Sequence, residues 1–315
     1  MTGFNSGTDH LTRSNVWTSM LKKILEDDLM ASKYIKMLDT FPDGDTINIP
    51  SIGQALVQNY VEDQSVKYSA MDTGNFTLTI NEYISSATYI TDKQKQDSFY
   101  VNELVASFVP KQARAIMSHF ETAVMALSAQ QTTSNANTIN GADHRYVGTG
   151  TNETLSLSDF AKARYALQKA NVPMTDLVAI VDPSVEFALA SIPNLSNMSS
   201  NPRWEGVVAD GISTGMKFIK NVHGFDVYTS NFLATANETI TSNGARTTAA
   251  GKANMFFSAA QDVLPFIGAW RQPIKVESER NKDYQRDEYV TTARYGVKLY
   301  RPENLVVVLT DTDQV

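Results

Sequence analysis

Cysteine is absent from the 315-residue sequence. Its absence excludes disulfide bonds, catalytic thiolates, zinc fingers and cysteine-ligated iron–sulfur clusters. Histidine is scarce, and its four positions are far apart: His10, His119, His144 and His223. No two of them have the close spacing of a local zinc or iron site. The sequence therefore predicts no metal and no other cofactor.

The sequence has fewer basic than acidic residues, and it lacks long apolar runs. Lysine and arginine number 27 against 34 acidic residues, which gives a formal charge of −7 and a pI near 5.2. A dedicated nucleic-acid binder would show a basic face instead. No run approaches the roughly 20 apolar residues of a membrane helix, and the N-terminus lacks the apolar segment of a signal peptide. We expect a soluble protein made in a cytoplasm, without a membrane partner.

One stretch matches a catalytic motif. GISTG, at 211–215, has the G-x-S-x-G pattern of a hydrolase nucleophile elbow around Ser213. In that fold an acidic residue and then a histidine follow the serine. Only His223 follows here, and no acidic residue lies between the two. No Walker A or dinucleotide-binding motif is present. We expect no enzyme activity, and a hydrolase using Ser213 is the weakest alternative.

Hydrophobic periodicity predicts a mixed α+β chain. The expected helices cover residues 14–38, 98–109, 110–128, 155–173 and 183–192. A break is placed at Pro110, because proline fits a first turn better than a helix interior. Ser158 is the expected cap of the fourth helix. In the long helix the apolar stripe includes Ile116, Phe120 and Val124.

The expected strands cover residues 75–91, 176–182, 223–233, 253–259 and 304–310. Residues 235–252 are expected to form a loop or a hairpin tip. Residues 275–300 are charged and partly alternating, which is typical of long solvated strands. Their mixed charges, from Glu277 to Glu288, indicate a solvated face or an intersubunit ion-pair network rather than an acid–base site.

A long polar stretch lies between two strand-like segments, near Ile47 and near Phe76. Loops longer than roughly 12–15 residues are usually functional or disordered. The stretch has little to bury in a core of its own. Its candidate contact residues are polar or aromatic: Gln54, Gln58, Tyr60, Glu62, Lys67 and Tyr68.

Two motifs resemble those of a known family. ARYGVKLYRPENLVVVLT, at 293–310, resembles the closing motif of tailed-phage major capsid proteins of the Hong Kong 97-type fold. HGFDVYTSNFL, at 223–233, resembles a strand that members of the same family often have at the corresponding place in the chain, before the closing motif. The matching positions are Arg294, Gly296, Arg301, Pro302, Glu303, Gly224 and Phe225. With the order of elements, the resemblance covers roughly residues 40–312.

The resemblance implies a division of the chain. Residues 1–44 correspond to an N-terminal arm, and residues 45–78 to an extended E-loop that contacts another subunit. Residues 79–154 and 272–315 correspond to a peripheral domain, with a spine helix at about 98–130. Residues 155–271 correspond to an axial domain, whose loops at 194–204 and 235–252 would gather around a capsomer axis.

The resemblance also implies a function and partners. The expected protein is a major capsid protein of the virion, which self-assembles into hexamers and pentamers of an icosahedral head. The head encloses double-stranded DNA without sequence-specific binding. Portal and decoration proteins are expected partners. About 40 residues precede the E-loop, so a separate scaffolding protein is expected rather than an internal one. Assembly is expected in the host bacterial cytoplasm.

Three points stay open at this stage. Lys67 could donate to an isopeptide cross-link, but most relatives lack that bond and we expect none here. An encapsulin-like nanocompartment shell is an alternative function with the same fold. Another virion protein, such as a tail protein, is the alternative from a different class.

Overall fold

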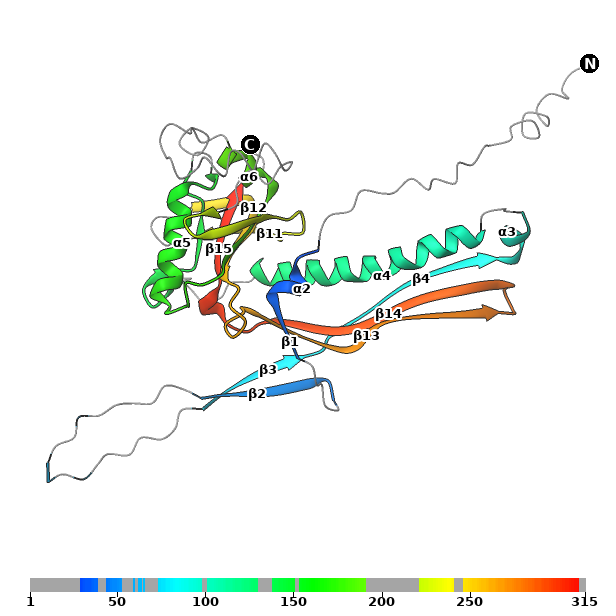
Figure 1. The fold of residues 1–315 in the computed structure, drawn as a ribbon, viewed down its shortest axis with the longest axis horizontal. Coiled ribbons are helices and arrows are strands. Elements are labelled where there is room, and N and C mark those ends of the chain that lie inside the picture. The colour runs from blue at the N-terminus through cyan, green and yellow to red at the C-terminus, as the bar shows by residue number, and fades with distance from the viewer. Residues whose placement is uncertain are drawn as a thin grey trace, which may run out of the picture.

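The computed structural model describes residues 29–38, 44–52, 59, 62–63, 65, 73–97, 101–129, 138–150, 153–190, 221–240 and 246–311. They form a long sheet packed against a long helix, with a second sheet and its helices at one end (Figure 1). A two-stranded hairpin leaves the body as a separate projection. The α+β class expected from the sequence is confirmed.

The long sheet has four strands in the order β1-β13-β14-β4. The hairpin of β13 (Phe266–Asn281) and β14 (Arg286–Leu299) is its centre. Strand β4 (Glu82–Thr91) pairs antiparallel with β14 at one edge. Strand β1 (Ile35–Leu38) pairs parallel with β13 at the other. The long solvated strands predicted from the charge pattern are these two central strands.

Helix α4 (Val101–Ala126) packs on one face of this sheet and continues into a 3₁₀ turn, Leu127–Ala129. The expected break at Pro110 is wrong, since the helix runs through this residue. Pro110 is exposed, so its ring lies away from the packed face. Packing of the helix on the sheet offsets the cost of the missing backbone hydrogen bond.

The expected helix over 14–38 is wrong at its end. Residues 14–28 lie outside the described part of the chain, and α2 is only Ala31–Tyr34. Residues 35–38 form β1, whose partner on β13 lies more than 200 positions away in the sequence. Local periodicity carries no information about such a distant pairing.

The second sheet has the order β7-β15-β12-β8-β10-β9, with β11 paired to β12. Its strands are β7 (Arg145–Val147), β8 (Leu177–Val181), β9 (Asn221–Val222), β10 (Phe225–Thr229), β11 (Thr235–Ile240), β12 (Arg246–Ser258) and β15 (Val306–Asp311). Helices α5 (Leu157–Lys169) and α6 (Pro183–Ala190) belong to the same unit. A small pair, β5 (Thr138–Ile139) and β6 (Ala142–Asp143), precedes it.

Three expectations for this unit can be compared with the structure. Strand β15 lies between β7 and β12, so residues 306–311 belong to the second sheet, whereas β13 and β14 belong to the long sheet. Of the loop and the hairpin expected over 235–252, the structure shows the hairpin strands β11 and β12. The N-cap of α5 is Ser156, not Ser158, because the Ser156 N–H donates to Asp159 at 2.8 Å in a capping box.

Candidate functional site

The projecting hairpin consists of β2 (Thr46–Ile52) and β3 (Thr73–Thr79). The two strands pair antiparallel from Thr46 opposite Thr79 to Ile52 opposite Thr73. The two strands extend away from the body (Figure 1), and residues 53–72 lie between them in the sequence. Of the predicted contact residues, Glu62 is described and exposed. The other five, Gln54, Gln58, Tyr60, Lys67 and Tyr68, lie outside the described residues.

The base of the hairpin is fixed to the long sheet. The Ile80 N–H donates to the Asp45 carbonyl at 2.8 Å. The Arg294 guanidinium donates to the Asp45 carboxylate at 2.6 Å. The ring of Phe76 packs edge-on against Tyr300, with centroids 5.0 Å apart. The hairpin therefore has a defined point of departure from the body.

Gly296 lets the hairpin approach the sheet closely. A Cβ at this position would lie 2.6 Å from the carbonyl oxygen of Thr79 and 3.0 Å from the Cα of Ile80. Any larger residue would push β14 away from the end of β3. Arg294 and Gly296, two of the motif positions, therefore act together where the hairpin joins the body.

The Arg301–Glu303 motif forms the turn into β15. Pro302 opens a short 3₁₀ turn, Pro302–Asn304, and the Arg301 N–H donates to the Pro265 carbonyl. The buried residue here is Asn304, which the motif search did not select. Its amide accepts from the Ser258 N–H and donates to the carbonyls of Ser258 and Val263, at 2.8, 2.8 and 2.6 Å. A polar residue directly before an apolar strand was the signal in the sequence.

Gly224 and Phe225 form the turn and start of β10. Gly224 has φ +90°, a conformation that glycine adopts without strain. Phe225 is fully buried and meets Phe160 and Phe256 edge-on, with centroids 6.3 and 5.4 Å apart. These two motif positions build the core of the second sheet.

The predicted stripe on α4 also faces a core. Ile116, Phe120 and Val124 are all less than 4% exposed. Phe120 stacks on Trp270 at a centroid distance of 4.9 Å and meets Tyr295 edge-on at 5.1 Å. Burial raises the pKa of the Tyr295 hydroxyl to about 12. These residues attach the helix to the long sheet of the same chain, so they are not free for another subunit.

Glu121 is a site that the sequence search missed. Its carboxylate is 1% exposed and accepts from the Met30 N–H at 3.0 Å and from the Ala31 N–H at 2.7 Å. The N-terminal segment is thereby fixed to the C-terminal part of α4. A charged residue on the apolar side of a helix was the available signal. Without the fold, the partner could not be identified.

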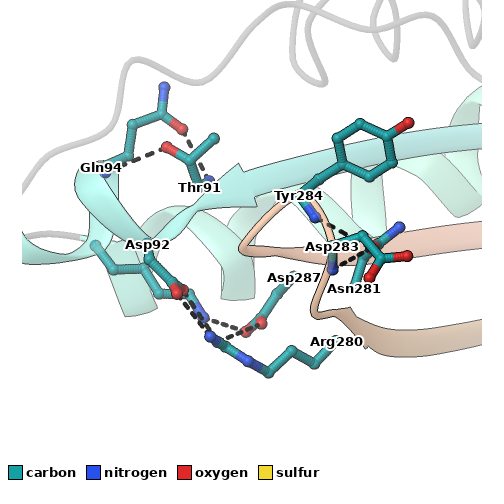
Figure 2. A network of polar contacts seen from close by, with 9 residues as sticks. Thr91, Asp92, Gln94, Arg280, Asn281, Asp283, Tyr284 and Asp287 are labelled. Carbon is teal, nitrogen blue, oxygen red and sulfur yellow. Dashed lines mark hydrogen bonds and ion pairs between the residues drawn. The ribbon is translucent and has the colours of Figure 1, made fainter.

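An ion-pair network occupies the far end of the long sheet (Figure 2). Arg280 donates to both oxygens of Asp92, at 3.0 and 2.6 Å, and lies 3.5 Å from Asp287. Lys95 pairs with Asp287 from the short helix α3 (Asp92–Asp97). The hydrogen bond from Arg280 lowers the pKa of Asp92. These contacts join α3 to the β13–β14 hairpin within a single chain.

The turn of that hairpin is ordered by a side chain. The Asn281 oxygen accepts from the N–H groups of Asp283 and Tyr284, at 3.1 and 3.4 Å (Figure 2). Gln285 has φ +49° and completes the turn. Beside it, Arg286 lies 4.5 Å above the ring of Tyr89 and 4.7 Å from that of Tyr284. These contacts hold the β13–β14 turn in place beside β4.

No group of three or more histidine and acidic residues that could hold a metal occurs in the described ranges. His119 contacts the Tyr295 hydroxyl at 2.8 Å, and burial lowers the pKa of His144. Ser213 lies outside the described residues. Among the helices that can be described, none is long and apolar enough to cross a membrane.

Comparisons with known proteins agree with this architecture. A family model described as phage capsid protein matches residues 76–308. No curated protein matches the sequence. A structure from Mycobacterium phage Che8 matches 93% of this chain and 95% of its own, at 17% identity and a TM-score of 0.66.

Two cyanophage structures give similar values. The capsid of cyanophage P-SCSP1u matches 94% of this chain and 93% of its own, at 15% identity and a TM-score of 0.67. The capsid asymmetric unit of cyanophage Pam1 matches 100% of both chains, at 12% identity and a TM-score of 0.65. At these identities the likeness concerns the fold, and it extends along nearly the whole chain.

Proposed function

The chain belongs to the phage capsid protein family, with the Hong Kong 97-like fold, and we propose that it forms the hexamers and pentamers of an icosahedral head shell. As a member of that family it is a structural protein of the virion. The proposal adds how its copies are arranged and which segments join them.

The projecting β2–β3 hairpin is the observation that carries the proposal. Its base is fixed by Asp45 and Gly296, while strands β2 and β3 extend away from the body of their own chain (Figure 1). A specific interface buries about 1,600 Å² in total, and a shell subunit needs several. A projecting arm supplies such area readily, because its surface is available to a neighbour.

The family resemblance supports roles for the other parts. We assign residues 1–44 to an N-terminal arm and residues 45–78 to the E-loop. The peripheral domain is then the long sheet with α4, and the axial domain is the seven-stranded sheet with α5 and α6. Because β7 and β15 pair within that second sheet, residues 145–147 and 306–311 are included in the axial domain.

The net charge of −7 suits a shell that encloses double-stranded DNA without binding it strongly. A surface rich in lysine would hold the phosphates, whereas a weakly negative wall lets the duplex slide during packaging. Portal, scaffolding and decoration proteins are the further partners that the resemblance supports. Assembly in the host cytoplasm accords with a chain that contains no cysteine.

The main test is deletion of residues 55–69 from the arm. The deleted chain should fold, because the base of the hairpin and both sheets are retained, but it should fail to form stable shells. Electron microscopy measures shell formation, and circular dichroism with thermal melting measures folding. Shells of normal stability from the deleted chain would refute the role of the arm.

A matched control separates length from side chains. In this control the same residues are replaced by a glycine–serine segment of equal length. If the side chains make the contacts, the replaced chain also fails to form stable shells.

The contents and shape of purified particles distinguish the alternative functions. Packaged DNA supports a phage head, a packaged enzyme indicates a nanocompartment, and tubes or rings indicate a tail protein.

A further inference from the structure

Strand β4 forms an open edge of the long sheet. Its ten residues pair with β14, from Glu82 opposite Tyr295 to Thr91 opposite Arg286. Within the ranges that the structure describes, no strand pairs with its other side. Along that side alternate backbone N–H and C=O groups have no strand partner in the described part of the chain. Such a row is a template for pairing with another chain.

The edge lacks the usual protection against such pairing. Natural edge strands are commonly short or bulged, or contain lysine or proline. Residues 82–91, EYISSATYIT, contain neither lysine nor proline, and their pairing with β14 has no register shift. The opposite edge, β1, is only four residues long. A long regular edge of this kind is expected to have a partner.

The face of β4 away from the helix has the composition of a contact surface. Alternate residues on this face are exposed, and two of them are large: Tyr83 is 67% and Tyr89 is 56% exposed. Ser85 and Ala87 lie between them. Tyrosine is enriched at protein interfaces, where charged residues are depleted from the core. Glu82 is the single charged residue of the strand.

The sequence of β4 is self-complementary about its centre. When two antiparallel copies place Ser86 opposite Ser86, Tyr83 of each lies opposite Tyr89 of the other. Ser85 then faces Ala87, and Glu82 faces Ile90, so that no like charges meet. Directly opposed aromatic residues stabilise antiparallel pairs.

We propose that β4 pairs antiparallel with β4 of a second copy across a twofold axis, which joins two long sheets into one. The contact is isologous and therefore closes after two chains. It rests on the proposed shell function, because one pair of ten-residue strands buries far less than the roughly 1,600 Å² of a stable interface. The pairing forms when other shell contacts bring the copies together.

Cysteine cross-linking tests the register, since the chain contains no cysteine of its own. In a Tyr83→Cys, Tyr89→Cys double variant, the two cysteines of one chain are about 20 Å apart along the strand. A disulfide needs Cα atoms within roughly 7 Å, so a bond can form only between chains. Oxidised shells should give chain dimers on a non-reducing denaturing gel, and no longer products.

The two single variants are matched controls. In the proposed register the same position in both copies is also separated by about 20 Å, so each single variant should stay monomeric on the gel. Ser86→Cys alone should give dimers, because opposed Cα atoms lie roughly 4.5–5.5 Å apart. Monomers from both the double variant and Ser86→Cys, in closed shells, would overturn the pairing. A ladder of longer products would equally overturn it, since it indicates a head-to-tail contact.

Hydrogen exchange of the unmodified chain provides an independent test that needs no variant to fold. The backbone amides of residues 82–91 that do not pair with β14 should exchange at least about tenfold more slowly in shells than in free subunits. Unchanged exchange in closed shells would overturn the pairing while the shell function stands. If the unmodified chain with its partners forms no shells at all, the proposed function itself fails.

Discussion

Glu121 offers a quantitative test of how the N-terminal segment is fixed. Its buried carboxylate accepts from the N–H groups of Met30 and Ala31. A hydrogen bond to a charged group contributes about 1.5–3 kcal/mol. Loss of both should therefore favour opening of this segment by about 3 kcal/mol or more. Because 1.4 kcal/mol is a factor of ten, the open population should increase roughly 100-fold.

Limited proteolysis of Glu121→Ala measures that opening. Lys33 is exposed in α2 and is a trypsin site close to the contact. When opening is fast compared with cleavage, the cleavage rate follows the open population. Cleavage at Lys33 should accelerate by roughly two orders of magnitude. Cleavage at Lys169, which is exposed in α5 of the other sheet unit, should be unchanged and serves as an internal reference.

Two further variants complete the test. Glu121→Gln keeps one oxygen acceptor and should show an intermediate rate. Thr122→Ala removes an exposed neighbour that donates only to the Ser118 carbonyl of its own helix, and should leave the rate unchanged. If cleavage at Lys33 in Glu121→Ala stays within about threefold of the original rate, the carboxylate does not hold the segment.

Three further outcomes are expected. Asn304→Ala leaves buried backbone groups unpaired and should reduce the free energy of unfolding by about 2–4 kcal/mol, measured by urea denaturation; a loss below the error of the fit would contradict this. Gly296→Ala places a Cβ 2.6 Å from the Thr79 carbonyl and should cost about 1–3 kcal/mol, with weaker shell formation. Arg280→Gln should lower the melting temperature at neutral pH. The pKa of Asp92 is lowered in the folded chain, so the stabilisation from this pair is present above the carboxyl's ordinary value of 3.8 and is lost as the pH falls through the lowered pKa. The difference between the two chains should therefore disappear in acid, and also at about 1 M salt, where the Debye length is roughly 3 Å; a difference that persists in both conditions would refute the ion-pair explanation.

Local pattern predicted most elements and much of the core. The helical spacing of Ile116, Phe120 and Val124 identified the face of α4 that packs on the sheet. The apolar runs at 176–182 and 304–310 correspond to the buried strands β8 and β15. The motifs around Arg294 and Gly224 led to the family, which the comparison with the phage capsid protein family confirmed. All of these signals are contained in short stretches of sequence.

Patterns in the sequence were enough to predict the α+β class, the family and the segment that forms the β2–β3 hairpin. The folded chain was needed to see that α4 continues through Pro110, that residues 35–38 form a strand, and that β15 joins the second sheet. It also revealed the partners of Glu121 and Asn304. The physical reason is distance along the chain: hydrophobic spacing records which face of an element is buried, whereas strand pairing and buried hydrogen bonds depend on residues that come together only in the folded protein.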